Sequence, residues 1–316
     1  TFDLRQMIEE VCTLLGTSAF KKGLEVIVSY DHKTSDRIIA DSMRLRQVMA
    51  NLIGNAIKFT STGHILVKVK EESRNSGNAL LNVSVTDTGI GIAPDVAEQL
   101  FDKFVQADGS ISRKFGGTGL GLSISQKLIQ LMGGIIEIKS QLDKGSTFSF
   151  SLNVPITNDK PSADTDKRIA SISSQYRLLI VDDHPVNLEM LEQLTKEWGF
   201  HPTLATSGEE ALRELRHFAS SGKPVELILS DYQMPAMNGL DLAHAIRAEP
   251  EIADAQIIIL SSSSFADDHQ RQMSELKIAS ALMKPIRSSE LRGTILDALT
   301  PREKKDSKSV DHDVVD

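Results

Sequence analysis

Two glycine-rich motifs constrain the fold of this chain more than any other feature. The first, Asp87-Thr88-Gly89-Ile90-Gly91, follows an alternating apolar run at residues 80–85 that predicts a strand. The second, Gly-Gly-Thr-Gly-Leu-Gly-Leu at residues 116–122, leads into residues 123–132, whose apolar positions recur at helical spacing. A glycine-rich turn that opens a helix favours a bound phosphate. The alternative is a flexible linker, but linkers do not connect a strand to a helix in this way. We therefore predict a nucleotide site.

Bulk properties narrow the class of protein. The 316 residues are enough for two domains with separate cores. A net charge of −8 and a pI near 5.6 argue against nucleic acid as a partner. No apolar run approaches about 18 residues, so we expect no membrane contact. The single cysteine, Cys12, predicts a packed thiol and a cytoplasmic location. The chain starts without Met inside an apparent helix, so we expect a piece of a longer protein, whose other parts could include a membrane anchor.

A predicted helix at residues 43–59 carries an unusual polar face. Asn51, Asn55 and Lys58 fall on neighbouring positions of this face, opposite the apolar stripe. Asparagine is only an average helix former, so two of them one turn apart need a reason. A solvated face is one explanation. Beside the glycine motifs we prefer a site in which an Asn oxygen holds a metal and Lys58 meets phosphate.

The remaining elements of the first half follow from hydrophobic periodicity. A helix is expected at residues 1–20, and strands at 24–28, 64–70, 80–85, 135–140 and 146–154. Residues 71–79 read as a polar hairpin loop. The long charged segment from residue 92 to 115 is typical of a lid, which could bring Arg113 to a terminal phosphate.

Five short motifs then occur in order: Asn51-x3-Asn55, Asp87-x-Gly89-x-Gly91, Phe101-x2-Phe104, Gly117-x-Gly119-x-Gly121 and Gly145-Ser146-Thr147. They resemble the N, G1, F, G2 and G3 boxes of sensor histidine kinases, and the resemblance covers residues 1–154. It implies a Bergerat-type α/β sandwich that binds ATP and Mg²⁺, with helices on one face of a mixed sheet.

The resemblance also implies roles for individual residues. Asp87 would accept a hydrogen bond from the adenine amino group, Asn55 would ligate Mg²⁺ between the phosphates, and Thr147 would support the adenine end. The glycines of the second motif would offer backbone N–H groups to the phosphates. The full nucleotide set implied in this way is Asn51, Asn55, Lys58, Asp87, Gly89, Gly91, Arg113, Gly117, Thr118, Gly119, Leu120, Gly121 and Thr147.

One position bears on the reaction. Related ATP-hydrolysing folds, such as type II topoisomerases, carry a Glu one turn before the metal-binding Asn, where it activates water. Here that position holds Asn51, which cannot act as a general base. We therefore expect ATP to be held for transfer and to be hydrolysed poorly.

Histidine kinases carry their phosphoacceptor in a helical hairpin, within a motif His-Glu/Asp-x-Arg/Lys-Thr-Pro. That motif does not occur among the histidines of this sequence. The partner expected by resemblance is therefore a hairpin of the same parent protein, which would be dimeric, or a hairpin supplied in trans.

The second half has a different organisation. Residues 155–175 read as a polar linker, residues 176–300 alternate strands with helices, and the charged tail 301–316 is expected to be disordered. Continuous apolar strands with intervening helices predict a doubly wound parallel sheet of the (βα)5, flavodoxin-like type.

Chemistry in such folds lies beyond the carboxyl ends of the strands. Those ends carry Asp182 and Asp183, then Asp231, Ser261 and Lys284. Three carboxylates at one edge repel one another unless a cation binds, and Mg²⁺ prefers oxygen ligands. The alternative is that Asp183 caps a helix and Lys284 is solvated.

Residues 177–300 resemble the receiver domain of response regulators, and the segment from Asp231 to Gly239 is close to that family's phosphorylation signature. The resemblance implies that Asp231 is the nucleophile. Asp182, Asp183 and the backbone carbonyl of Gln233 would place Mg²⁺, Lys284 would pair with the phosphoryl group, and Ser261 would turn toward it. Many receivers carry Tyr or Phe three positions before the Lys; here Ala281 replaces it, which puts the usual switch coupling in doubt.

Together the two halves resemble part of a hybrid sensor histidine kinase. The route implied runs from ATP to a His on the hairpin, then to Asp231, and onward to a His-containing phosphotransfer protein. Two alternatives stay open. The chain could be a regulatory module in which ATP binding and receiver phosphorylation control partner docking, or ATP could phosphorylate Asp231 directly.

Overall fold

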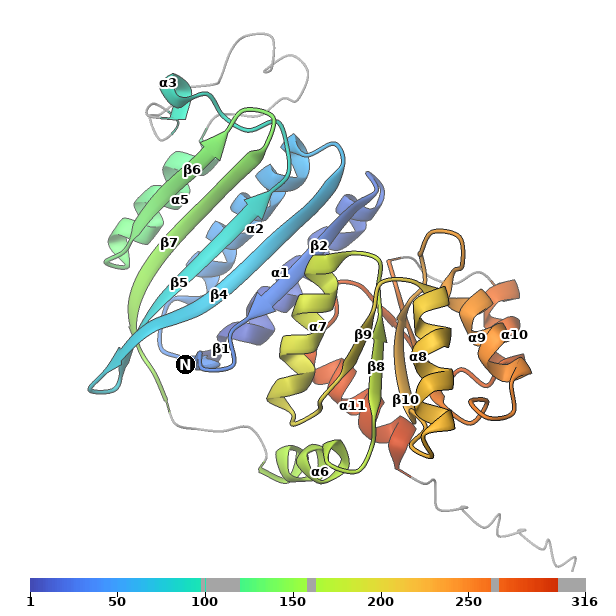
Figure 1. The fold of residues 1–316 in the computed structure, drawn as a ribbon. Helices are drawn as coiled ribbons and strands as arrows, with labels where there is room; N and C mark the ends of the chain where they lie inside the picture. The colour runs from blue at the N-terminus through green and yellow to red at the C-terminus, as the bar shows by residue number, and fades with distance from the viewer. Residues whose placement is uncertain (98–99, 101–119, 158–162, 263–266, 301–316) are drawn as a thin grey trace, which may run out of the picture.

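The protein is described here by a computed structural model, which covers residues 1–97, 100, 120–157, 163–262 and 267–300 (Figure 1). Two five-stranded sheets organise these residues. One sheet belongs to the N-terminal half and is mixed; the other belongs to the C-terminal half and is parallel.

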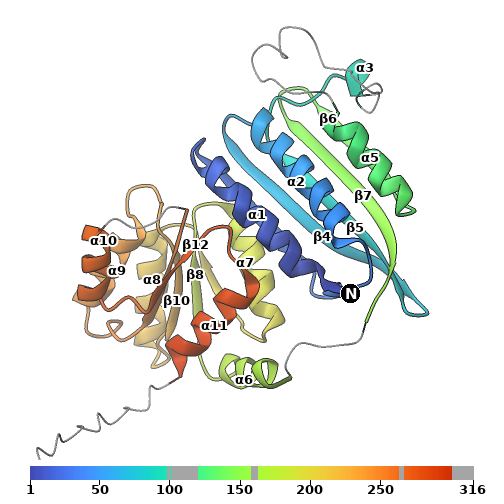
Figure 2. The same cartoon turned by 180° about the vertical axis from the view of Figure 1, so that it is seen from behind.

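The N-terminal sheet has the strand order β2-β4-β5-β7-β6, in which only the β2–β4 pair is parallel. Helices α1, α2 and α5 cover one of its faces (Figure 2). The elements are β1 (Phe2–Asp3), α1 (Leu4–Phe20), β2 (Leu24–Tyr30), β3 (Arg37–Ile38), α2 (Ser42–Phe59), β4 (Gly63–Asn75), β5 (Asn78–Asp87), α3 (Pro94–Ala97), α5 (Gly121–Leu131), β6 (Ile135–Gln141) and β7 (Gly145–Pro155).

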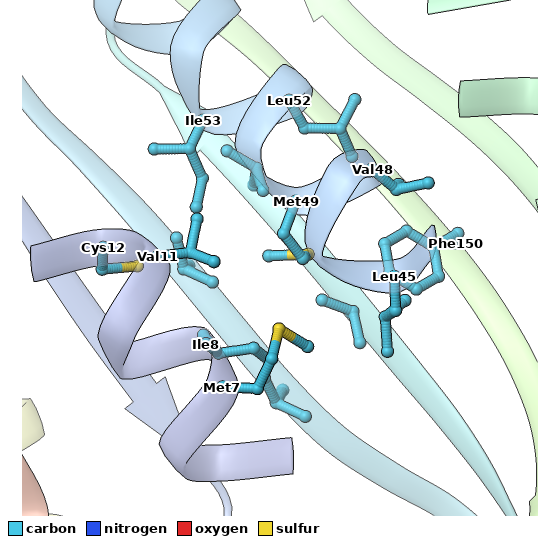
Figure 3. Close-up of a cluster of buried hydrophobic side chains, with 14 of the residues drawn as sticks. Met7, Ile8, Val11, Cys12, Leu45, Val48, Met49, Leu52, Ile53 and Phe150 are labelled. Carbon is cyan, nitrogen blue, oxygen red and sulfur yellow. The ribbon is translucent and has the colours of Figure 1, made fainter. Parts of the chain in front are cut away.

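The core of this half lies between the helices and the sheet. The apolar stripes of α1 and α2 face each other and the strands, as Figure 3 shows. Capping fixes where both helices begin, because Asp3 and Asp41 each accept a hydrogen bond from a backbone N–H of the first turn. The labelled side chains are Met7, Ile8, Val11, Cys12, Leu45, Val48, Met49, Leu52, Ile53 and Phe150. Cys12 is fully buried, as predicted.

The expected polar loop at residues 71–79 is wrong. Strands β4 and β5 continue through most of it and pair as far as Asn75 and Asn78. The connection is a two-residue turn, in which Ser76 and Gly77 both have positive φ, at 46° and 88°. Such turns match the twist of the flanking strands. The polar residues misled the prediction because this end of the hairpin is exposed to solvent.

The C-terminal half is the predicted doubly wound sheet. All its pairs are parallel, and the strand order is β12-β11-β10-β8-β9. Side chains of the strands alternate between two apolar clusters, one under α7 and α11 and one under α8 and α9. The elements are α6 (Ala163–Ser173), β8 (Leu178–Val181), α7 (Pro185–Glu197), β9 (Thr203–Ala205), α8 (Gly208–Ser220), β10 (Leu227–Asp231), α9 (Gly239–Ala248), β11 (Gln256–Ser261), α10 (Asp267–Glu275), β12 (Ser280–Met283) and α11 (Ser288–Leu299).

Helix α6 lies within the segment expected to be a linker. Ile169 is 2% exposed and packs with the cluster under α7 and α11, and Ile172 and Tyr176 pack against the same cluster. The spacing of these three residues is helical, but the surrounding Ser, Asp and Lys residues masked it. The tail 301–316 lies outside the described residues.

The two halves touch along α1 and β2 on one side, and along α7 and the segment joining β12 to α11 on the other (Figure 1). Arg5 lies 3.4 Å from Glu197, the Arg287 Nε donates to Thr13, and the backbone N–H of Ser288 donates to Glu9. Ile27 of β2 packs into the apolar cluster of the C-terminal half. Among the described residues, no helix is both long and apolar enough to cross a membrane.

The buried Glu9 makes stability depend on pH. Burial raises the pKa of its carboxyl to about 7 from an ordinary 4.5. Between these values the folded chain holds a proton that the unfolded chain has lost, so stability falls as pH rises through this window. We expect the free energy of unfolding of Glu9→Gln to match that of the wild type near pH 4.5 and to exceed it by about 2 to 3 kcal/mol at pH 8.

Urea unfolding across this pH range measures the difference. The matched control is Glu10→Gln, since Glu10 lies at the surface beside Arg46 and has a lowered pKa. If the difference in free energy of unfolding between the wild type and Glu9→Gln stays constant from pH 4.5 to 8, the raised pKa of Glu9 is contradicted.

Candidate functional sites

The first candidate site centres on Asp87, the last residue of β5. Its side chain is 5% exposed and lies on the helix-covered face of the sheet, in line with Val83 and Val85. The Gly89 N–H donates to its Oδ1 at 2.8 Å. Burial raises the pKa of the Asp87 carboxyl, while hydrogen bonds from Gly89 and Ser146 oppose that rise. A buried acceptor held by backbone donors suits recognition of a ligand amino group.

Two glycines let the chain close around Asp87. Gly91 has a φ of 67°, and a Cβ there would lie 2.0 Å from the Gln141 carbonyl oxygen. Gly145 has a φ of 103°, and a Cβ there would lie 1.9 Å from the Asp87 carbonyl oxygen. Any other residue at these positions would force β5, β6 and β7 apart at the site.

Helix α2 contributes the asparagines. The Asn51 amide donates to the Ser125 hydroxyl at 2.8 Å, and a Cβ on Gly121 would lie 2.3 Å from the Asn51 Oδ1. Asn51 therefore ties α2 to the start of α5. Asn55 lies one turn further on, half-buried, and the Lys58 Nζ lies 4.8 Å from the ring centre of Phe59.

The structure places Thr147 away from this site. Its hydroxyl lies 2.9 Å from that of Thr86, and Thr86 and Thr147 are paired across β5 and β7. Because side chains alternate along a strand, this pair occupies the face opposite Asp87. Ser146 is the residue paired with Asp87, is 6% exposed, and lies on the Asp87 face. Ser146, and not Thr147, is therefore the residue that shares the face of Asp87. The strand register decides between Ser146 and Thr147, and the motif alone does not reveal that register.

Several predicted nucleotide residues lie outside the described residues. They are Arg113, Gly117, Thr118 and Gly119, together with Phe101 and Phe104 of the segment predicted to be a lid. Of the second glycine motif, the structure describes Leu120, which is the N-cap of α5, and Gly121, its first residue. The described part of the motif does open a helix, as predicted.

The second candidate site lies where β8 and β10 end side by side. The strand order reverses direction between them, which is where doubly wound folds bind ligands. Asp182, Asp183 and Asp231 each place a carboxylate oxygen within 4.8 Å of the others, with Asp182 and Asp231 buried. Hard oxygen donors at this spacing fit Mg²⁺. Burial, and then the charge of Asp182, raise the pKa of Asp183.

Lys284 follows β12 and reaches into this cluster. Its Nζ lies 2.8 Å from the Asp231 Oδ1 and 2.9 Å from the Asp182 Oδ2. Burial alone would lower the pKa of Lys284, but the surrounding carboxylates raise it above its ordinary value. Burial raises the pKa of Asp231 to about 6, Lys284 opposes that rise, and Asp182 adds to it. The alternative of a solvated Lys284 is wrong, since its side chain is 9% exposed.

The remaining receiver residues occupy the same edge. Ser261 ends β11, is fully buried, and accepts a backbone hydrogen bond from Lys284. Gln233 is exposed two residues after Asp231, in the loop that leads to α9. Ala281 is paired with Ile259 of β11 and packs against the cluster under α8 and α9.

Two residues of this site were missed from the sequence. Asn187 of α7 donates to both carboxylate oxygens of Asp182, at 3.1 and 3.2 Å. Glu25 comes from β2 of the other half and accepts from Lys284 at 3.3 Å and from Asn187 at 2.9 Å. The sequence signal for Glu25 was a single acidic residue in an otherwise apolar predicted strand, Leu24 to Val28. The apolar Ile27 lies two positions further along and so shares the face of Glu25.

Family comparisons agree with this division. Residues 40–156 match the model described as histidine kinase-, DNA gyrase B- and HSP90-like ATPase. Residues 178–296 match the response regulator receiver domain. The chain is a homologue of hybrid sensor histidine kinases. The predicted family and fold are thereby confirmed, and we call the two halves the ATPase domain and the receiver domain.

Relatives of this kinase homologue match it across both domains. Sensor histidine kinase AruS of Pseudomonas aeruginosa is 34% identical over 292 residues, which is 92% of this chain and 28% of AruS. Virulence sensor protein BvgS of Bordetella bronchiseptica is 33% identical over 306 residues, or 93% of this chain and 24% of BvgS. The chain thus spans less than a third of the length of either relative.

A solved structure shares the fold over both domains. The crystal structure of full-length ShkA in complex with AMPPNP has a TM-score of 0.68 and 25% sequence identity. The match covers 95% of this chain and 57% of that one.

Because Ser146 and Thr147 lie on opposite faces of the sheet, substitutions at these two positions should differ in their effect on nucleotide affinity. Ser146→Ala should weaken binding of a fluorescent ATP analogue about five-fold, the equivalent of one hydrogen bond. Thr147→Val keeps the volume and removes only the bond to Thr86, so its affinity should stay within two-fold of wild type, roughly the scatter of such a titration. Titration of the analogue with each variant measures this. A larger loss for Thr147→Val than for Ser146→Ala would contradict the register argument.

Proposed function

We propose that this chain carries two steps of a phosphorelay. The ATPase domain holds Mg-ATP for phosphorylation of a His on a helical hairpin of the parent protein, or on one in trans. The receiver domain then accepts the phosphoryl group on Asp231. The observation that carries the proposal is the position of Asp231 between Lys284 and the two acidic residues that follow β8. Homology to hybrid sensor histidine kinases supports the order of the steps.

In the ATPase domain, the residues divide by what they would contact. Asp87, which holds the Gly89 N–H and is paired with Ser146, would accept a hydrogen bond from the adenine amino group. Asn55 is the residue that would hold Mg²⁺ with the phosphates, and Lys58 lies one turn beyond it. The Asn51 amide donates to Ser125 and is not a base. At this position the described part of the site therefore has no group that could activate water. This supports transfer to a side chain over hydrolysis.

In the receiver domain, an Asp231 oxygen attacks the phosphorus of the phosphohistidine. A P–O bond forms, the P–N bond breaks, and the electron pair stays on the imidazole, which takes its proton from water. Asp182, Asp183 and Asp231, with the Gln233 carbonyl, would hold Mg²⁺, which supplies charge neutralisation for the transferring group. Lys284 pairs with a phosphoryl oxygen, and Ser261 lies at the end of the neighbouring strand, within the same edge.

A regulatory module without transfer is the second candidate. In it, ATP binding and the state of Asp231 control docking of a partner. The direct contact between the ATPase domain and the receiver site through Glu25 is the observation that favours it.

Intact mass spectrometry separates the steps. Incubated with Mg²⁺ and phosphoramidate, a small donor with a P–N bond, the chain should gain one phosphoryl group, and Asp231→Asn should gain none. With Mg-ATP and a histidine kinase hairpin, wild type should be phosphorylated as well. Asp87→Asn should fail with ATP yet still respond to phosphoramidate, because only the nucleotide site is changed.

The outcomes discriminate between the candidates. Phosphate on Asp231→Asn would refute the acceptor assignment. A chain that binds ATP and gains a phosphoryl group from phosphoramidate, but transfers none from ATP through the hairpin, would support the regulatory module.

A further inference from the structure

Within the part of the chain that the structure describes, Glu25 of the ATPase domain forms an ion pair with Lys284 of the receiver's phosphorylation site. It lies on the edge strand β2, and with Ile27 it faces away from the ATPase core. Ile27 is 2% exposed and packs among apolar receiver side chains. The Glu25 side chain is 26% exposed, with its two oxygens divided between Lys284 and Asn187. We call this set of bonds the Glu25 contact.

The Glu25 contact uses the same ammonium group that a phosphoryl group would need. A Lys ammonium has three N–H donors. Here the Lys284 Nζ has three carboxylate partners, at 2.8 Å on Asp231, 2.9 Å on Asp182 and 3.3 Å on Glu25. A new acceptor must therefore displace one of them. The bond to Glu25 is the longest, and Glu25 is the most exposed of the three carboxylates.

We propose that the Glu25 contact holds the ATPase domain on the receiver only while Asp231 is unphosphorylated, and that phosphorylation of Asp231 releases it. The proposal rests on the proposed role of Asp231 as acceptor. It assigns to β2 of the ATPase domain a second task, which is to report the state of the receiver site.

The change in charge on phosphorylation favours release of Glu25, as does the limited number of N–H donors on Lys284. Phosphorylation replaces one negative charge on Asp231 by about two and adds strong acceptor oxygens. These oxygens compete for Lys284, and their charge repels the Glu25 carboxylate across the same few ångströms. The Asn187 amide, which donates to Glu25 and to both oxygens of Asp182, is uncharged and so does not offset this repulsion.

The rest of the interface combines apolar packing of Ile27 and Leu66 and the His64–His184 ring contact with a few polar bonds. Besides Ile27, it includes the Arg5–Glu197 pair at 3.4 Å and the bonds that Thr13 and Glu9 accept from the start of α11. Partly exposed ion pairs contribute little by themselves. A change in one buried charge contact can therefore shift the equilibrium between docked and separated domains.

The test measures the distance between the domains in the full chain. Spin labels attached after Glu72→Cys on β4 and Ser220→Cys on α8 lie on exposed sites of the two domains. Cys12 is buried and its thiol stays protonated, since burial raises its pKa. Beryllofluoride with Mg²⁺ stands in for the phosphoryl group, and its fluorine NMR signal reports binding independently of the distance.

We expect beryllofluoride to move the distance distribution from one narrow peak to a longer, broad one in the wild type. Glu25→Gln keeps the shape but removes the charge, so it should show the broad distribution already without beryllofluoride and change little on its addition. Glu197→Gln is the matched control. It removes an interface charge away from Asp231, so it should loosen docking while keeping the response to beryllofluoride.

Two results would overturn the proposal in different ways. If beryllofluoride binds but the wild-type distance stays unchanged, or if Glu25→Gln stays docked, the Glu25 contact has no such role and the acceptor function stands. If no fluorine signal of bound beryllofluoride appears in the wild type, the acceptor function fails, and the proposal fails with it.

Discussion

The Lys284 ammonium group is the interaction on which the receiver end of this molecule depends. It balances two buried carboxylates, Asp182 and Asp231, which would otherwise repel each other in a place with little water. Because the same group also reaches Glu25, one side chain joins the chemistry of the receiver to the position of the other domain. Because the carboxylates around Lys284 already use its N–H donors, an anion that binds here must replace one of the existing hydrogen bonds.

The ATPase domain is organised differently, through close approaches of the backbone. Asp87 is held by N–H groups from Gly89 and Ser146, while Gly91 and Gly145 allow neighbouring chain segments to pass within contact distance. Asn51 connects α2 to α5 at the point where the second glycine motif becomes a helix. The end of the site around Asp87 is therefore held by close contacts between backbone segments.

Much of this was readable from the sequence. Helical and strand periodicity, with glycine motifs at their junctions, predicted both sheets, and the acidic strand ends predicted the cluster around Asp231. The errors share a cause, which is that local composition hides long-range pairing. Polar residues 71–79 looked like a loop because their partners lie across a hairpin, and α6 was hidden because Ile169 is buried only by distant segments. Thr147 was placed by motif, whereas register with β5 selects Ser146. The single acid in the strand marked Glu25 as unusual, but its role depends on which face of β2 meets the receiver, and the sequence does not reveal that.

The meeting of α1 with the segment after β12 has one more consequence. A Cβ on Gly16 would lie 2.9 Å from the Pro285 Cδ, so the two domains touch here with no side chain between them. Pro285 directly follows Lys284 in the chain. A single substitution at Gly16 would therefore push against Pro285 and alter the spacing of the domains directly beside Lys284. Within a lineage of such proteins, this position offers a simple route to chains whose two domains respond independently.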